Sequence, residues 1–138
     1  MIELLAKVMA SYGEVWVVAP DRDRSGVSHA ITLNAPLRIE QLGPRRFVCD
    51  GTPTDSVYLA INQMKLAPDL VVSGVNPGPN LGQDVLYSGT VAGALEGAHW
   101  GIPSVAISHC STDTDQFGEL EPLLPGIVDL ANDMVAGN

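Results

Sequence analysis

One stretch decides the fold of this chain, namely Asp69-Leu-Val-Val-Ser-Gly-Val-Asn-Pro-Gly-Pro-Asn-Leu-Gly-Gln-Asp-Val-Leu-Tyr-Ser-Gly-Thr-Val-Ala-Gly-Ala-Leu-Glu-Gly97. Its apolar run at residues 70–72 is typical of a strand buried in a parallel sheet. A loop rich in glycine, proline and asparagine follows, and Ser88-Gly89-Thr90 then begins a helix of small residues. Open α/β sheets bind anionic ligands where such a strand, loop and helix N-terminus meet. The sequence therefore predicts the functional site here.

Strands and helices alternate along the rest of the chain. The predicted strands lie at residues 15–19, 70–73 and 104–108, the predicted helices at 2–12, 52–65, 88–100 and 121–136, and a β-hairpin arm at 30–50. The second helix has the clearest start, because Thr52 can cap it, Pro53 suits its first position and Asp55 can reach back. The alternation predicts one α/β domain, residues 1–138, with a mostly parallel sheet and helices on both faces.

The composition is that of a folded protein. Hydrophobic residues make up 46% of the 138 residues, too many for a disordered chain, and no apolar run is long enough to span a bilayer. The first residues show helical periodicity and lack the basic head and apolar stretch of a signal peptide. The two cysteines, Cys49 and Cys110, have no metal-binding spacing, so we expect reduced core thiols in a cytoplasmic protein.

Charge is distributed unevenly. Residues 1–65 hold all seven basic residues and seven of the sixteen acidic ones, so residues 66–138 carry the whole net charge of −9. A nucleic-acid surface on this second half is excluded, because neutralising phosphates requires lysine or arginine. An anion near Ser88 would then depend on backbone N–H groups, the helix dipole or a metal ion. We expect residues 113–133 to form a solvated acidic face.

Several common catalytic patterns are absent. Glycines 74, 78 and 82 have the wrong spacing for a dinucleotide-binding loop, and no lysine follows Lys65 to complete a Walker-type phosphate loop. Ser88 lacks the preceding glycine of a nucleophile elbow. The three histidines have no metal-pair spacing, and each is interpreted as a lone surface or packed residue: His29, His99 and His109.

The remaining candidates are oxygen ligands that follow predicted strands. Ser25 follows the strand at 15–19, and Asn76 and Asn80 follow the strand at 70–73. Because parallel strands end at one edge of a sheet, these side chains should converge there. Hydroxyl and amide oxygens suit Mg²⁺ or Mn²⁺ when at least one carboxylate completes the set. The nearest carboxylates are those of Asp21, Asp23 and Asp84. The alternative is that these residues only shape turns.

Five segments, in order, carry a resemblance to a known family. They are residues 17–29, 51–56, 72–82, 87–97 and 101–108. Together they resemble the survival protein E (SurE) family of metal-dependent 5′-nucleotidases. The resemblance implies a Rossmann-like core, a divalent cation (Mg²⁺ or Mn²⁺), and hydrolysis of nucleoside 5′-monophosphates to nucleoside and phosphate. It also implies a homo-oligomer, a dimer or tetramer, for the full-length protein, with no membrane or nucleic-acid partner.

The resemblance assigns roles to particular residues. Ser25 and Asn76 resemble the serine and asparagine metal ligands of the family. The residues that resemble its phosphate lining are Asn80, Ser88, Gly89 and Thr90. This assignment agrees with the helix start predicted at Ser88, whose first amides can hold phosphate oxygens without a lysine.

The chain also departs from the family pattern. The family signature begins with a central first strand that ends in Asn-Asp-Asp-Gly, whose aspartates supply the charged metal ligands. This sequence begins within the following helix, so the resemblance supplies no catalytic residue. The strands at 15–19 and 70–73 should then lack their shared neighbour. Because the family's C-terminal part is missing as well, we expect a fragment truncated at both ends and weakly active or inactive alone.

Two other classes of function remain open. A non-catalytic nucleotide- or phosphate-binding module would keep the helix start at Ser88 without the metal carboxylates, and its binding would be indifferent to chelator. An assembly protein would instead use the arm at residues 30–50 as a contact. In that case substitutions of Ser88 and Thr90 would leave partner binding intact.

Overall fold

The structure is a computed structural model that describes residues 2–111 and 118–136. Its elements alternate as the sequence predicts, which confirms an α/β fold. In chain order they are α1 (Ile2–Met9), β1 (Val17–Pro20), β2 (Ile39–Gly43), β3 (Arg46–Cys49), α2 (Pro53–Tyr58), the π-helical turn η1 (Leu59–Gln63), β4 (Val71–Pro77), the 3-10 turn η2 (Gly82–Leu86), α3 (Gly89–His99), β5 (Ser104–His109) and α4 (Leu124–Ala136).

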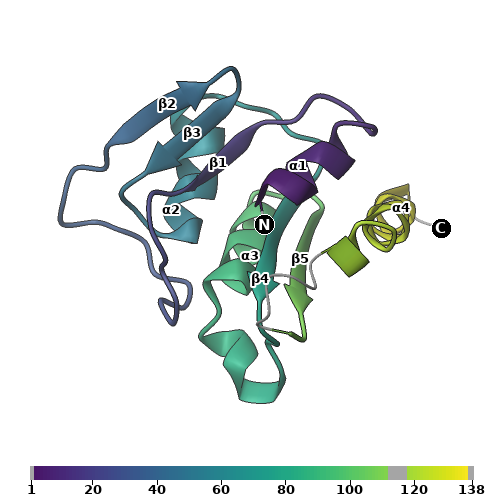
Figure 1. The fold of residues 1–138 in the computed structure, drawn as a ribbon. Helices are drawn as coiled ribbons and strands as arrows, with labels where there is room; N and C mark the ends of the chain where they lie inside the picture. The colour runs from purple at the N-terminus through teal and green to yellow at the C-terminus, as the bar shows by residue number, and fades with distance from the viewer. Residues whose placement is uncertain (1, 112–117, 137–138) are drawn as a thin grey trace.

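The strands form two separate sheets. β1 pairs in parallel with β3, which pairs antiparallel with β2, while β4 and β5 form a second, parallel pair. Within the described residues no ladder joins β1 to β4, and the ribbon shows the two strands apart (Figure 1). The expectation that these two strands lack a shared neighbour is therefore confirmed. One consequence is that every residue of β1 is only half-buried, where the sequence predicted a buried strand.

Helices cover both faces of the β4–β5 sheet. On one face α3 lies so close that a Cβ added at Gly93 would be 2.8 Å from Ser73 Oγ. On the other face α1 and α4 enclose the main hydrophobic core (Figure 1). The buried core residues are Leu5, Val8, Val75, Ile107, Leu120 and Leu124. This two-sided cover matches the prediction for an α/β sheet.

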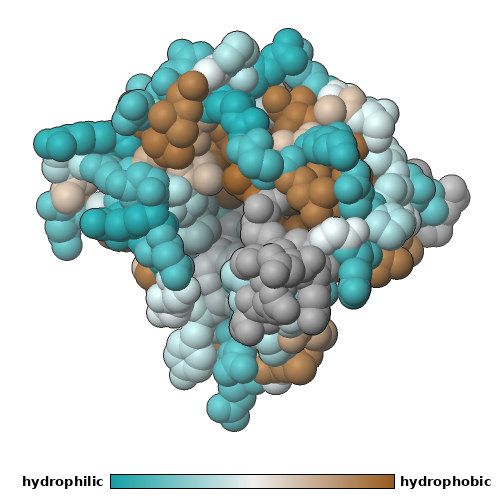
Figure 2. Space-filling model, in the orientation of Figure 1, coloured by the Kyte–Doolittle hydropathy of each residue, from teal (hydrophilic) through white to brown (hydrophobic). Residues whose placement is uncertain are grey.

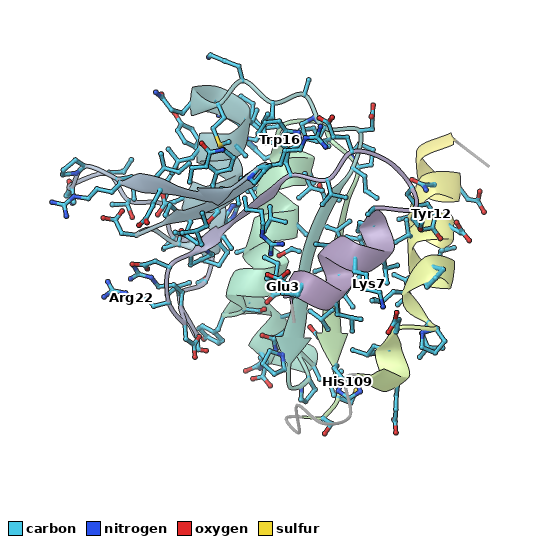
Figure 3. All side chains as sticks on the ribbon, turned by 45° about the horizontal axis from the view of Figure 1, so that its top comes forward. Glu3, Lys7, Tyr12, Trp16, Arg22 and His109 are labelled. Atoms are coloured by element: carbon cyan, nitrogen blue, oxygen red, sulfur yellow. The ribbon has the colours of Figure 1, made fainter. Side chains whose placement is uncertain are left out.

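Two polar contacts fix α1 against the C-terminal part of the chain. Lys7 Nζ lies 2.6 Å from Glu121 Oε1, and Tyr12 donates a 3.1 Å hydrogen bond to the carbonyl of Pro125. Figure 3 shows Lys7 and Tyr12 on the side of α1 that faces α4. Because the ion pair is exposed, it contributes little, about 0–1 kcal/mol. Burial of Leu5 and Leu124 dominates this interface.

Several predicted boundaries need correction. The first helix ends at Met9, because residues 10–12 form turns. The hairpin is confined to β2 and β3, and it is not a free arm, since β3 is the central strand of its sheet. β4 runs to Pro77, so Asn76 is a strand residue paired with Ser108 and not a loop residue. The last helix begins at Leu124.

Cys49 is a buried free thiol as predicted, whereas Cys110 is exposed because it follows the end of β5. The predicted acidic face lies partly outside the described residues, since Asp113 and Asp115 fall in 112–117. On the side of the molecule that Figure 2 shows, hydrophobic residues form separate patches among hydrophilic ones. None of the helices in the described ranges is long and apolar enough to cross a membrane.

Candidate functional site

A cavity of about 700 Å³ lies between β1 and β4 and extends to the loops at their C-terminal ends. All six residues singled out in the sequence line it, namely Ser25, Asn76, Asn80, Ser88, Gly89 and Thr90. They come from the loop after β1, from β4 and the loop after it, and from the start of α3. Residues up to 65 positions apart, from Ser25 to Thr90, therefore meet in one cavity as the strand-end argument predicts.

The two candidate metal ligands, Ser25 and Asn76, both line the cavity. Ser25 Oγ donates a 2.7 Å hydrogen bond to Asp23 Oδ1, which places a carboxylate beside the hydroxyl. Asn76 Nδ2 donates to the carbonyl of Gly78 at 2.9 Å. Its Oδ1 is 3.4 Å from Thr90 Oγ1, so the oxygen is turned toward the start of α3. The available donors are thus a hydroxyl, an amide oxygen and one adjacent carboxylate, all hard oxygen ligands.

The three carboxylates named from the sequence differ in position. Asp23 and Asp84 line the cavity, but Asp21 does not, and its Oδ1 is 3.7 Å from Arg24 Nη2. Among residues 2–111 and 118–136, no three His, Cys, Asp or Glu side chains form a group that could hold a metal ion. A carboxylate-rich metal centre is therefore not assembled by this part of the chain.

The start of α3 also lines the cavity, next to Asn76. Ser88 is its N-cap, and Ser88 Oγ accepts a 3.2 Å hydrogen bond from Val91 N. The amides of Gly89 and Thr90 lie in the first turn, where a helix offers no backbone acceptor. Together with the helix dipole they can bind an anion. Asn80 is held nearby by a 2.6 Å hydrogen bond from its Nδ2 to Ser108 Oγ at the end of β5.

Position 89 is tightly packed. A Cβ on Gly89 would be 3.0 Å from Pro53 Cγ and 3.3 Å from Val27 Cγ2. The first turn of α3 is thus packed between the start of α2 and the loop after β1. This packing brings the loop that carries Ser25 against the first turn of α3.

Hydrogen bonds that the sequence does not reveal join the loop after β1 to the segment before α3. Ser28 Oγ donates to the carbonyl of Leu86 at 2.7 Å, and Ser28 N donates to the carbonyl of Tyr87 at 3.0 Å. Ser28 has φ of 54°, a left-handed backbone that is uncommon for serine. No local pattern could have found these contacts, because their partners lie nearly sixty positions apart.

His29, interpreted as a lone surface or packed histidine, is packed against α3 but is not alone, because it has a carboxylate partner. Its Nε2 lies 2.9 Å from Glu96 Oε2 on α3, and the other oxygen of Glu96 accepts a 2.9 Å hydrogen bond from Trp100 Nε1. The Glu96 side chain is only 9% exposed, so its carboxylate needs these partners. The pair is a second tie between the loop after β1 and α3.

Two arginines also line the cavity. They modify the expectation that an anion near Ser88 would depend on backbone N–H groups, the helix dipole or a metal ion. The sequence places no basic residue after Lys65, yet Arg22 and Arg24 reach the cavity from the loop after β1. Figure 3 shows Arg22 extending outward from this loop. Arg24 Nη2 donates to the carbonyl of Asp50, which anchors the loop to the end of β3. An anion in the cavity therefore has cations nearby in addition to helix amides.

The fold and the cavity together describe an α/β protein with a polar cavity at the C-terminal ends of its strands. Comparison with known proteins makes the class specific. The family described as Survival protein SurE matches residues 1–136. The chain therefore belongs to the SurE family.

Relatives and a solved structure agree with this membership. The chain is 57% identical over 108 residues to the 5′-nucleotidase SurE of Anaeromyxobacter sp. (strain K), covering 77% of this chain and 42% of that protein. It is 55% identical over 107 residues to the 5′-nucleotidase SurE of Legionella pneumophila, covering 78% and 43%. The crystal structure of the SurE protein from Aquifex aeolicus matches with a TM-score of 0.87 and 41% identity, covering 95% of this chain and 54% of that one. The chain thus spans less than half the length of these curated relatives.

Proposed function

We propose that this chain is part of a metal-dependent 5′-nucleotidase, a phosphomonoesterase that hydrolyses nucleoside 5′-monophosphates to nucleoside and phosphate. The observation that carries the proposal is the cavity, which Ser25 and Asn76 line together with the start of α3. Oxygen ligands and free helix amides in one cavity suit a cation and a phosphate held together. The similarity to two 5′-nucleotidases of the SurE family supports the same activity.

The side chains present fit a divalent cation only in part. Ser25, Asn76 and Asp23 would hold Mg²⁺ or Mn²⁺ through a hydroxyl, an amide and a carboxylate oxygen. Such an ion supplies polarisation of the phosphoryl group and a lowered pKa for bound water. With a single carboxylate beside Ser25, its affinity for this chain should be low.

Other residues that line the cavity would bind and orient the phosphate. The Gly89 and Thr90 amides would bind phosphoryl oxygens and stabilise their charge through the helix dipole. Asn80, fixed by Ser108, would orient the phosphate from the side of β5. The Arg24 guanidinium would add positive charge to the same cavity.

We propose that the full-length protein has a more complete sheet and a more complete metal site than this chain. The open space between β1 and β4 would hold the family's first strand, which would join both sheets into one mostly parallel, Rossmann-like sheet. That strand would bring the paired aspartates of the family signature to the cation. We further propose a cytoplasmic homo-oligomer, a dimer or tetramer, for the full-length protein.

A first experiment compares cation binding by the 138-residue chain and two variants. Calorimetric titration with Mn²⁺ should show binding that Ser25→Ala weakens about tenfold or more, because one of few ligands is removed. Ser11→Ala is the matched control, since Ser11 lies after α1, outside the cavity lining, and its hydroxyl donates a 2.8 Å hydrogen bond to the carbonyl of Val8. Equal affinity in all three proteins would contradict the assignment of Ser25.

The activity itself is tested by phosphate release from nucleoside 5′-monophosphates, with Mn²⁺ and again with chelator. Release that depends on Mn²⁺ is expected, at a low rate. A melting curve by circular dichroism on the same sample establishes that the protein is folded.

A non-catalytic nucleotide- or phosphate-binding module is the second candidate. The observation in its favour is that no group of three or more acidic, histidine or cysteine ligands is found in the described ranges. This function predicts nucleotide binding that is unaffected by chelator. The phosphatase function predicts that chelator weakens it.

A further inference from the structure

Tyr87 occupies an unusual position at the rim of the cavity. It lies between η2 and the Ser88 cap of α3, and it is among the residues that line the cavity. The residue is 62% exposed. Within residues 2–111 and 118–136 its ring has no hydrogen bond and no aromatic partner. The ring therefore contributes little to packing within this part of the chain.

The backbone of Tyr87, in contrast, is fixed by hydrogen bonds with Asp84 and Ser28. Tyr87 N donates a 3.1 Å hydrogen bond to the carbonyl of Asp84, and the Tyr87 carbonyl accepts one of 3.0 Å from Ser28 N. The preceding carbonyl, of Leu86, accepts a 2.7 Å bond from Ser28 Oγ. Ser28 makes both bonds from a left-handed conformation with φ of 54°. An exposed aromatic side chain is thus presented at the cavity by a fixed main chain.

The proposed phosphate site next to Tyr87 indicates which part of a ligand its ring would contact. A phosphate bound by the Gly89 and Thr90 amides would lie within three residues of Tyr87 along the chain. The group esterified to that phosphate must then leave the cavity past its rim. An exposed aromatic face binds nucleobases by stacking, and such stacking tolerates different bases because each has a π-face.

We propose that Tyr87 is the stacking surface for the base of the bound nucleotide, so that the site favours phosphate esters whose alcohol part carries an aromatic base. This inference rests on the proposed function, because it needs a phosphate at the start of α3. It predicts a preference for nucleotides over aliphatic sugar phosphates. It also predicts weak discrimination between purine and pyrimidine bases.

The test compares two ligands that differ only in the base, adenosine 5′-monophosphate and ribose 5-phosphate. Their dissociation constants are measured by calorimetry in the presence of Mn²⁺ for the 138-residue chain, Tyr87→Leu and Tyr87→Phe. Tyr87→Leu should weaken adenosine 5′-monophosphate about tenfold, the effect of losing one base–aromatic stack, and leave ribose 5-phosphate within about twofold. Tyr87→Phe keeps the ring and should bind both ligands like the unsubstituted chain.

Tyr58→Leu is the matched control. Tyr58 is 38% exposed and packs edge-on against Trp100, outside the cavity lining. Equal loss of both ligands in Tyr87→Leu, or no loss of either, would overturn the stacking role while leaving the proposed function intact. Failure of the unsubstituted chain to bind either ligand or inorganic phosphate would overturn the proposed function and the stacking role together.

Discussion

At the scale of single residues, Asp55 organises the region behind the site. Its side chain is fully buried and accepts hydrogen bonds from Thr32 N at 2.9 Å, Thr32 Oγ1 at 2.7 Å and Thr52 N at 2.8 Å. Burial by itself would raise the pKa of Asp55, but the hydrogen bonds from Thr32 and Thr52 outweigh it, and the pKa is lowered from 3.8. The ionised carboxylate therefore joins the segment before β2 to the start of α2.

The lowered pKa of Asp55 predicts how the stability of the fold changes in acid. Because the pKa of Asp55 is lower in the folded state, its ionisation stabilises the fold above the unfolded pKa of about 3.9. That contribution is lost as the pH falls through the folded-state pKa. Asp55→Asn should lower the free energy of unfolding by about 2 kcal/mol at neutral pH. It should also flatten the decline of stability in acid.

Urea unfolding from about pH 7 to about pH 3 measures both effects. Asp69→Asn is the control, because Asp69 is exposed and should change neither. An acid-dependent loss of stability that is the same in Asp55→Asn and in the unsubstituted chain would show that another group is responsible.

The sequence could predict the hydrogen bonds between Asp55 and Thr52, but not those between Asp55 and Thr32. The capping box of Thr52 and Asp55 is local, three residues apart, and it is confirmed in full. The bonds from Thr32 join residues 23 positions apart, and those of His29 and Glu96 span 67. Side-chain contacts of that range depend on how the elements pack, so no local pattern contains them.

At the scale of elements, α3 depends on its glycines. A Cβ at Gly97 would lie 2.9 Å from Val71 Cγ2, closer than real Cβ atoms approach, and one at Gly93 would be 2.8 Å from Ser73 Oγ. These glycines allow the helix to lie directly on β4 and β5. The start of α3, and with it the amides proposed to bind phosphate, is thereby held at the edge of the sheet. The sequence predicted the helix and its cap but not which surface its small residues contact.

Gly97→Ala should therefore destabilise the protein by about 1–3 kcal/mol, because the side chains of Val71 and Ser104 must shift. Gly126→Ala in α4 is the matched control, since a Cβ there has no neighbour within 4 Å. Alanine is the better helix former, so this control should gain about 0.5–1 kcal/mol. Thermal melts of both variants measure the contrast. A gain in both would mean that α3 does not pack closely on the sheet.

At the scale of the whole molecule, the division into two sheets is the dominant feature. A second cavity of about 610 Å³ lies toward the other ends of the strands, and it shares Ile2, Val18 and Val72 with the first. The space between β1 and β4 thus runs along the strands and joins the two cavities. Backbone groups along both facing edges have no ladder partner within the described residues, and such groups are costly when buried.

The family resemblance anticipated this division, whereas the strand patterns alone did not. Local sequence shows that 15–19 and 70–73 are apolar and extended, but it contains nothing about which strands are neighbours. The parallel pairing of β1 with β3 was likewise not predicted, because it joins the hairpin to a strand more than twenty-five residues earlier. Sheet order is a property of the assembled chain.

The last prediction concerns a chain extended at its N-terminus by the family's first strand and its Asn-Asp-Asp-Gly loop. The added strand should pair with both β1 and β4, so amide hydrogen exchange at Val18 and Val72 should slow and the melting temperature should rise. The two aspartates should also raise Mn²⁺ affinity and restore chelator-sensitive phosphate release, since charged ligands hold such cations more tightly than neutral ones. A second extension with both aspartates changed to asparagine separates these effects. It should keep the slower exchange and lose the activity. If the first extension left exchange and melting unchanged, the space between β1 and β4 would not be the place of that strand. If it bound no Mn²⁺ and released no phosphate, the proposed activity would be wrong.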